Sequence, residues 1–315
     1  MTDRIEIRPL IENDIPEADR IMRLAFGTFL GLEDPSAHMG DADYVRSRWT
    51  ASPEAAFAAE MDGKLIGSNF ATRWGSFAFF GPLTVDPALQ DQGIGGWLVE
   101  PVIELFDTWG VTQTGLFTFA DSPKHIGLYQ KFGFRPRAPT VIMERTVGKT
   151  ARNGPHWTTF SRLGDPDRVR ALDACRGITN QIYPGLDANG EVQSLEAQSH
   201  GDTVLLGSGE LLGFAACHTG SGSEAGSGVC YIKFGAVAPG VIAETHFRDL
   251  LRTTEEFAAS RGAERVVAGV NTARVEAYQA MLSEGFGVSR SGVAMHRPNE
   301  SGFSKPGVFV IDDWR

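Results

Sequence analysis

A glycine-containing turn is the segment of this chain whose residue types most clearly suggest chemistry. It reads Gln90-Asp91-Gln92-Gly93-Ile94-Gly95, follows an apolar stretch and continues through Gly96 into a sequence with helical periodicity. At the start of a helix, free backbone N–H groups and the positive end of the helix dipole converge on one point, which attracts a diphosphate. Gly93 and Gly95 have no side chains to obstruct phosphate oxygens. The turn is therefore predicted to bind a phosphorylated ligand.

Two widespread phosphate-binding motifs do not fit this turn. A dinucleotide-binding motif needs a third glycine, but Leu98 stands three residues after Gly95. A Walker-type loop needs a Gly-Lys-Ser/Thr triplet, and none follows the turn. Taken by itself, the motif also leaves open a plain turn between a strand and a helix.

The second candidate is a tyrosine near the end of a short helix. Its segment reads Leu128-Tyr129-Gln130-Lys131-Phe132-Gly133-Phe134, in which Gly133 is a typical helix stop. A tyrosine hydroxyl has an ordinary pKa of about 10, so it stays protonated at neutral pH and can donate to a leaving group. The alternative is that Tyr129 is only a core aromatic residue.

Together with Leu83-Thr84-Val85-x-Pro87, these motifs resemble the GNAT superfamily of N-acetyltransferases, and the resemblance covers residues 4–146. In that family the glycine turn binds the pyrophosphate of coenzyme A, the preceding strand pairs with the pantetheine arm, and the tyrosine lies near the thioester sulfur. The resemblance implies acetyl-CoA as co-substrate, no metal, and Tyr129 as the acid for the departing thiolate. The implied cofactor contacts are Leu83, Thr84, Val85, Gln90, Asp91, Gln92, Gly93, Ile94, Gly95, Gly96 and Ser122.

Two positions depart from the family pattern. Ser122 stands where the family often has Asn, and His125 stands where it often has Ala. Ser122 can still hydrogen-bond the pantetheine region. His125 is expected to be a surface or lining residue, and its nearness to the thioester leaves open a role as a base.

The acceptor is less well defined than the donor. An acidic segment with Glu33, Asp34, Asp41 and Asp43 follows the first expected helix, where this family walls its acceptor pocket. A solvated acidic loop is one interpretation of these residues. As a group they also indicate a positively charged acceptor. No single residue among them is predicted to be the general base.

Alternating strands and helices must position these residues. We expect a strand at Ile5–Ile7, a helix over 18–29, a hairpin of 56–61 and 65–70 turning at Asp62-Gly63, and a long strand over 77–85. A helix over 98–109, kinked at Pro101, then leads to a strand over 114–120. A short helix ends at Phe132-Gly133, and a strand over 140–145 closes the unit.

The same order of elements starts again in the second half. A constant offset of 152 residues pairs Val85 with Val237, Leu98 with Leu250, and Gly133-Phe134 with Gly285-Phe286. This self-similarity indicates an internal duplication. We therefore predict an α/β (α+β) chain, a tandem of two GNAT-like units, each a mixed, mostly antiparallel sheet flanked by helices. The predicted units are residues 1–147 and 156–315, joined by a linker at 148–155, with a strand over 156–163 opening the second.

The second copy lacks the residues that carry the chemistry. The offset maps Gly93 to Thr245, Gly95 to Phe247 and Tyr129 to Met281. Side chains at both glycine positions would block a phosphate, and Met281 cannot donate a proton. The second unit is predicted to have lost cofactor binding and to bury a face of the first unit, complete the acceptor pocket, or both. A final strand over 307–311 is expected in either sheet.

Bulk composition limits the classes of protein this can be. The 315 residues are 42% hydrophobic with a formal net charge of −10, which excludes sequence-independent nucleic-acid binding. No apolar run is long enough to cross a bilayer, and the first residues show no export signal. Three cysteines without metal-ligand spacing fit a reducing compartment. We expect a soluble, cytoplasmic monomer or homodimer.

These features predict an acyltransferase that moves the acetyl group of acetyl-CoA to a primary amine of a small molecule. The amine would attack directly in a ternary complex, because no Cys or Ser with a base partner lies near the glycine turn. Two alternatives stay open. One is a non-catalytic acyl-CoA-binding regulatory module, and the other is a protein or peptide N-acetyltransferase.

Overall fold

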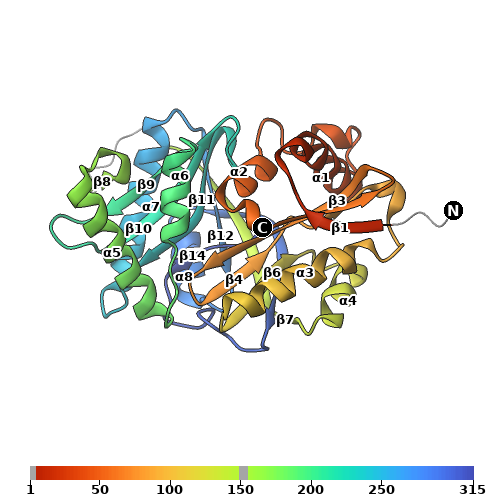
Figure 1. The fold of residues 1–315 in the computed structure, drawn as a ribbon. Helices are drawn as coiled ribbons and strands as arrows, with labels where there is room; N and C mark the ends of the chain where they lie inside the picture. Colours follow the sequence, from red (N-terminus) through yellow and green to blue (C-terminus); the bar gives the residue numbers. More distant parts are fainter. Residues whose placement is uncertain (1–4, 149–154) are drawn as a thin grey trace.

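The computed structural model describes residues 5–148, here called the first half, and residues 155–315, the second half. Within these ranges the strands form one 14-stranded sheet flanked by helices (Figure 1). Pairing is mostly antiparallel, with parallel pairs at β4–β6 and β11–β12. The predicted fold class is confirmed. The strands of the first half are β1 (Ile5–Pro9), β2 (Ala56–Met61), β3 (Lys64–Trp74), β4 (Phe77–Phe80), β5 (Thr84–Val85), β6 (Gln113–Thr118) and β7 (Arg135–Thr146).

The second half repeats this pattern. Its strands are β8 (Trp157–Thr159), β9 (Gly201–Leu206), β10 (Gly213–Gly220), β11 (Gly226–Val237), β12 (Arg265–Asn271), β13 (Gly287–Arg297) and β14 (Val310–Ile311). The helices of the two halves are α1 (Ile15–Phe29), α2 (Tyr44–Ala51), α3 (Ile94–Trp109) and α4 (Pro123–Lys131), then α5 (Asp165–Ile182), α6 (Asn189–Ala197), α7 (Ala243–Ser260) and α8 (Val275–Ser283). The offset of 152 residues places both ends of α4 on the ends of α8.

The predicted unit boundaries stay a prediction, and most of the predicted linker lies outside the described residues.

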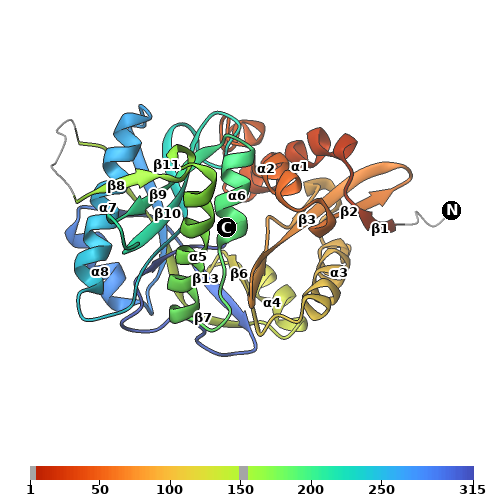
Figure 2. The same cartoon turned by 60° about the vertical axis from the view of Figure 1, so that its left-hand side comes forward.

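The two halves exchange their last long strands. β13 of the second half lies between β6 and β7, and β7 of the first half lies between β13 and β12 (Figure 2). The expectation that the strand over 140–145 closes the first unit is therefore wrong, because this strand pairs only with strands of the second half. Both strands are buried on both faces over part of their length, at residues 140–143 of β7 and 292–296 of β13. The exchange places residues of β13 inside the first half.

The long strand expected over 77–85 is also wrong, because it consists of two short strands. Both β4 and β5 pair with β3, through Phe80 opposite Ala71 and Thr84 opposite Ser68. Pro82 has no N–H to donate, so the ladder is broken between them. When pairing resumes, the register is shifted by one residue, which makes this a β-bulge. At the bulge, the segment between β4 and β5 separates from β3, next to the strand predicted to pair with pantetheine.

Smaller differences concern the second half. The strand expected over 156–163 is only β8, followed by a 3-10 turn at Phe160–Arg162. The final strand, β14, pairs with β11 and so belongs to the second half. All three cysteines are buried free thiols. No helix of residues 5–148 and 155–315 has the length and apolarity needed to cross a membrane.

Candidate active site

The glycine turn lies at the N-terminus of α3, as the sequence predicts. Gly93 is the N-cap residue, with φ of 85°, a left-handed conformation that favours glycine. The first turn of a helix leaves its N–H groups without carbonyl partners, and the side chains of Ile94 and Leu98 anchor this turn in the core. The positive end of α3 therefore faces solvent at a fixed place.

A cleft of about 630 Å³ opens in front of this turn. A Cβ added at Gly95 would lie 3.4 Å from Leu128 Cδ2, so any larger side chain there must project into the cleft. The cleft is large enough for a nucleotide-bearing thioester, and the glycines that line it leave room for phosphate groups. Of the predicted contacts, those that line it are Leu83, Thr84, Val85, Gln90, Asp91, Gly93, Ile94, Gly95, Gly96 and Ser122, together with Tyr129. Gln92 is exposed and does not line the cleft.

Two lysines of α4 also line the cleft and were not predicted from the sequence. Lys124 Nζ lies 2.7 Å from Asp91 Oδ1 and donates to Gln90 Oε1 at 3.3 Å. This contact ties α4 to the glycine turn. Lys131 lines the cleft from the same helix. The charge of Lys124 is paired with that of Asp91, and Lys131 adds a second amine to the lining of the cleft. Two lysines on the short helix that carries Tyr129 were the sequence signal for these cleft residues.

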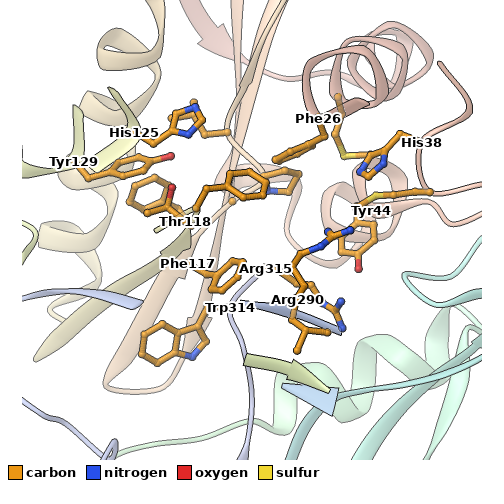
Figure 3. Close-up of a pocket in the computed structure, with 18 residues that line it drawn as sticks. Phe26, His38, Tyr44, Phe117, Thr118, His125, Tyr129, Arg290, Trp314 and Arg315 are labelled. Atoms are coloured by element: carbon orange, nitrogen blue, oxygen red, sulfur yellow. The ribbon is translucent and has the colours of Figure 1, made fainter. Parts of the chain in front are cut away.

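Tyr129 and His125 lie one helical turn apart on α4. The helix starts where Ser122 Oγ accepts the His125 N–H at 3.4 Å, and Gly133, with φ of 87°, follows its end. The Tyr129 ring packs edge-on against Phe80 at 5.7 Å between centroids. Its hydroxyl points into a cavity, as Figure 3 shows. Within the described ranges this hydroxyl has no hydrogen-bond partner. Burial raises the pKa of Tyr129 above its ordinary value, so the hydroxyl stays protonated.

The cleft leads past Tyr129 into an inner cavity of about 110 Å³. Cleft and inner cavity share the walls Phe26, Leu83, Phe119, His125 and Tyr129. Most of the remaining lining is apolar or aromatic, and Arg290, Trp314 and Arg315 come from the second half. The second half therefore contributes to the wall of this cavity, and its predicted role in completing an acceptor pocket stays a prediction.

Two neutral imidazoles lie at opposite ends of the inner cavity. Burial, with a smaller contribution from Lys124, lowers the pKa of His125 below its ordinary value. Burial also lowers the pKa of His38, helped by the charges of Arg290 and Arg23. The buried Nδ1 atom of His125 has no partner in the described residues. Each imidazole can therefore accept a proton near neutral pH.

The four carboxylates of the acidic segment do not line the inner cavity, although His38 and Met39 of the same segment do. Glu33 is exposed, and Asp34 accepts the Ser36 N–H at 3.0 Å. Asp41 accepts from Ser227 N and Oγ at 2.9 and 2.5 Å, and Asp43 caps α2 through the Arg46 N–H. The lining residues of the inner cavity include two guanidinium groups and no acidic side chain. The structure gives no support to a cationic acceptor.

In the second half, bulky side chains stand at the positions equivalent to Gly95 and Tyr129. Phe247 and Met281, which correspond to Gly95 and Tyr129, are fully buried in one apolar core. The Phe247 ring packs against Phe309 at 5.4 Å. These side chains occupy the place that the cleft has in the first half.

Part of the chain matches a known protein family. Residues 19–134 match the model of the acetyltransferase (GNAT) family. Over 103 residues, 33% of this chain and 34% of the relative, the sequence is 28% identical to the mycothiol acetyltransferase of Clavibacter michiganensis subsp. michiganensis. The chain thus matches about a third of that relative's length.

Solved structures share the fold over nearly the whole chain. A protein of Pyrococcus horikoshii is 16% identical with a TM-score of 0.70, covering 98% of this chain and 95% of its own. A GCN5-related N-acetyltransferase from Sphaerobacter thermophilus is 18% identical with a TM-score of 0.63, covering 94% and 96%. A tandem GNAT protein from the clavulanic acid biosynthesis pathway is 14% identical with a TM-score of 0.57, covering 93% and 98%. Residues 19–134, which hold the glycine turn and Tyr129, thus match the acetyltransferase (GNAT) family model, and the whole chain shares its fold with solved structures that include a tandem GNAT protein.

Proposed function

We propose that the protein transfers an acetyl group from acetyl-CoA to the amine of a small molecule at one working site, in the first half. The observation that carries this proposal is the path from the glycine turn at Gly93, past Tyr129, into the inner cavity. A donor and an acceptor can therefore approach Tyr129 from opposite sides. The small volume of the inner cavity, and its closure by the second half, favour a small acceptor over a peptide.

Different residues of the cleft would bind different parts of acetyl-CoA. The N–H groups at the start of α3, with Lys124 and Lys131 nearby, would hold the pyrophosphate. The backbone around Leu83, which is not paired with β3, would hydrogen-bond the pantetheine arm and direct the thioester towards Tyr129. As the amine nitrogen bonds to the carbonyl carbon and the carbon–sulfur bond breaks, the Tyr129 hydroxyl would give its proton to the sulfur.

The ammonium form of the acceptor must lose a proton before it attacks. His125 is the imidazole at the thioester end of the inner cavity, and its lowered pKa keeps it unprotonated near neutral pH. We assign it the role of general base. One ammonium proton would pass to His125 before the attack, and the second N–H proton, released as the amide forms, would replace the proton that Tyr129 gives to sulfur.

This role predicts a pH profile. Because the pKa of His125 is lowered, kcat/KM should stay on its plateau down to about pH 6.5, the ordinary imidazole pKa, and fall only below it. In a His125→Gln variant kcat/KM should drop about 100-fold, and its acid limb should move towards the amine pKa of about 10. A His246→Gln variant in the second half should keep the original profile. An unchanged limb in His125→Gln would exclude this role.

Thiol release tests the proposed function. Acetyl-CoA and a panel of primary amines are supplied to the full chain, with free thiol measured by a colorimetric reagent and the acetylated amine identified by mass spectrometry. We expect thiol release that depends on the amine and matches product formation one for one. Tight binding of acetyl-CoA with no thiol release on any amine would favour a non-catalytic acyl-CoA-binding module.

A further inference from the structure

The inner cavity has two chemically different ends. Its thioester end is shared with the cleft and contains Tyr129 and His125. Its other end opens into an outer cavity of about 500 Å³ between the two halves, and the residues shared there include His38, Tyr44, Arg290 and Arg315. No residue of the described chain lines both the cleft and the outer cavity. Figure 3 shows the two guanidinium groups on the side away from Tyr129.

A β-bulge in the exchanged strand aims Arg290 at this cavity. On β13, Val288 lies opposite Met143 of β7, but Arg290 lies opposite Ile142, so Ser289 is the extra residue. Ser289 Oγ donates to the Ile142 carbonyl at 3.2 Å and holds the bulge. Directly opposite residues point to the same face of a sheet. The bulge therefore turns Arg290 to the face of Ile142, which lines the cavity, and away from that of Met143.

Arg290 is a cation without a counter-charge. Among residues 5–148 and 155–315, no carboxylate lies within 4.0 Å of its guanidinium, whereas Arg315 pairs with Asp313 at 3.3 Å. Arg290 is near enough to His38 for its charge to lower the pKa of that imidazole. Its side chain is exposed and lies where the inner and outer cavities meet. An unpaired guanidinium at the mouth of an apolar cavity can bind an anion there.

The acidic groups near Arg290 are either engaged elsewhere or confined to the outer cavity. Glu224 is paired with Arg48 and Lys233, and Asp41 is held by Ser227. Glu144 is exposed and lines only the outer cavity. The inner cavity thus has a positive end at Arg290 and an apolar middle.

We infer that the acceptor is an ω-amino acid, a small molecule with an apolar body, an amine for the thioester end and a carboxylate at the far end that Arg290 binds. This inference rests on the proposed function and names the substrate class of the same site. Carboxylates fit the planar guanidinium with two parallel hydrogen bonds. An amine at the other end of the molecule would then lie beside His125 and Tyr129.

Matched amines test this inference. The thiol-release rates of ω-amino acids of increasing chain length are compared with those of the plain alkylamines and α-amino acids of equal length, for example 6-aminohexanoate with hexylamine and norleucine. We expect 6-aminohexanoate or a homologue to exceed both matched compounds in kcat/KM by about 10- to 100-fold. Arg290→Gln should lower kcat/KM for the ω-amino acid until its ratio to that of the matched alkylamine is about one. Arg46→Gln, which removes an exposed guanidinium elsewhere, should keep the preference.

The outcomes separate this inference from the proposed function. Equal use of alkylamines by the wild type, or a preference that survives Arg290→Gln, overturns the inference and leaves acetyl transfer intact. Preference for α-amino acids also overturns it. If no amine releases thiol, the proposed function fails, and calorimetric titration of the ω-amino acids in the presence of coenzyme A decides the inference. Binding that Arg290→Gln abolishes supports it, and absent or unchanged binding overturns it.

Discussion

A Tyr129→Phe variant is expected to bind acetyl-CoA as the wild type does and to lose about 10²- to 10⁴-fold in kcat. Phenylalanine keeps the edge-on packing against Phe80 and removes only the hydroxyl that faces the cavity. Without a donor the sulfur must leave as a free thiolate or take its proton from water. Single-turnover thiol release and calorimetric titration of acetyl-CoA separate the chemical step from binding.

The matched control is Tyr278→Phe. Tyr278 packs against the core of the second half, on the helix that corresponds to α4. Its loss of a hydroxyl should leave kcat unchanged. If Tyr129→Phe retains full kcat, or loses activity only through weaker acetyl-CoA binding, Tyr129 is not the acid.

A Glu224→Ala variant is expected to lower the free energy of unfolding by about 3–5 kcal/mol, because it leaves buried cations uncompensated. The Glu224 carboxylate accepts from Arg48 Nε at 3.2 Å and from Lys233 Nζ at 2.7 Å. Lys233 Nζ also lies 3.1 Å from Glu191, which accepts the Trp74 indole N–H at 3.0 Å. These buried groups connect α2 and β3 of the first half with β11 and α6 of the second half.

The charge state of Glu224 supports this prediction. Burial raises its pKa, but the charges of Arg48 and Lys233 outweigh burial and hold the pKa below its ordinary value. Its contribution to stability is therefore present above about pH 4.3, the unfolded pKa, and is lost as pH falls towards the folded pKa. Urea unfolding at pH 7 measures the effect. Glu244→Ala, which breaks an exposed pair with Arg248, should cost at most about 1 kcal/mol, and an equal cost at both positions would contradict the account.

The glycine turn and Tyr129 could be located from the sequence because their determinants are local. Gly93 and Gly95 are two residues apart, and a left-handed N-cap with a bare first turn needs glycine at those positions whatever packs around them. Tyr129 likewise depends on a short helix with its own start and stop signals, Ser122 and Gly133. Contiguous segments of this kind retain their spacing in the fold.

The acceptor end could not be predicted because distant segments build it. Nothing local in β7 or β13 indicates which half each strand joins, since both strands contain a similar run of consecutive buried residues. The position of Arg290 depends on that exchange and on a one-residue bulge, which an alternating pattern does not reveal. The acidic segment suggested a cationic acceptor, but its carboxylates have other partners in the fold. Asp41 accepts a hydrogen bond from Ser227, in the second half, and Asp43 accepts one from the Arg46 N–H.

The central claim is that the first half holds the one acyl-CoA site of this chain, and calorimetric titration of acetyl-CoA tests it most directly. The wild type should bind one molecule per chain. Gly95→Phe, which introduces the residue found at the equivalent Phe247 position, should abolish binding because its ring must enter the cleft. Thr245→Phe, on the exposed first turn of α7, should bind as the wild type does. Two molecules bound per chain, or unchanged binding by Gly95→Phe, would contradict the account.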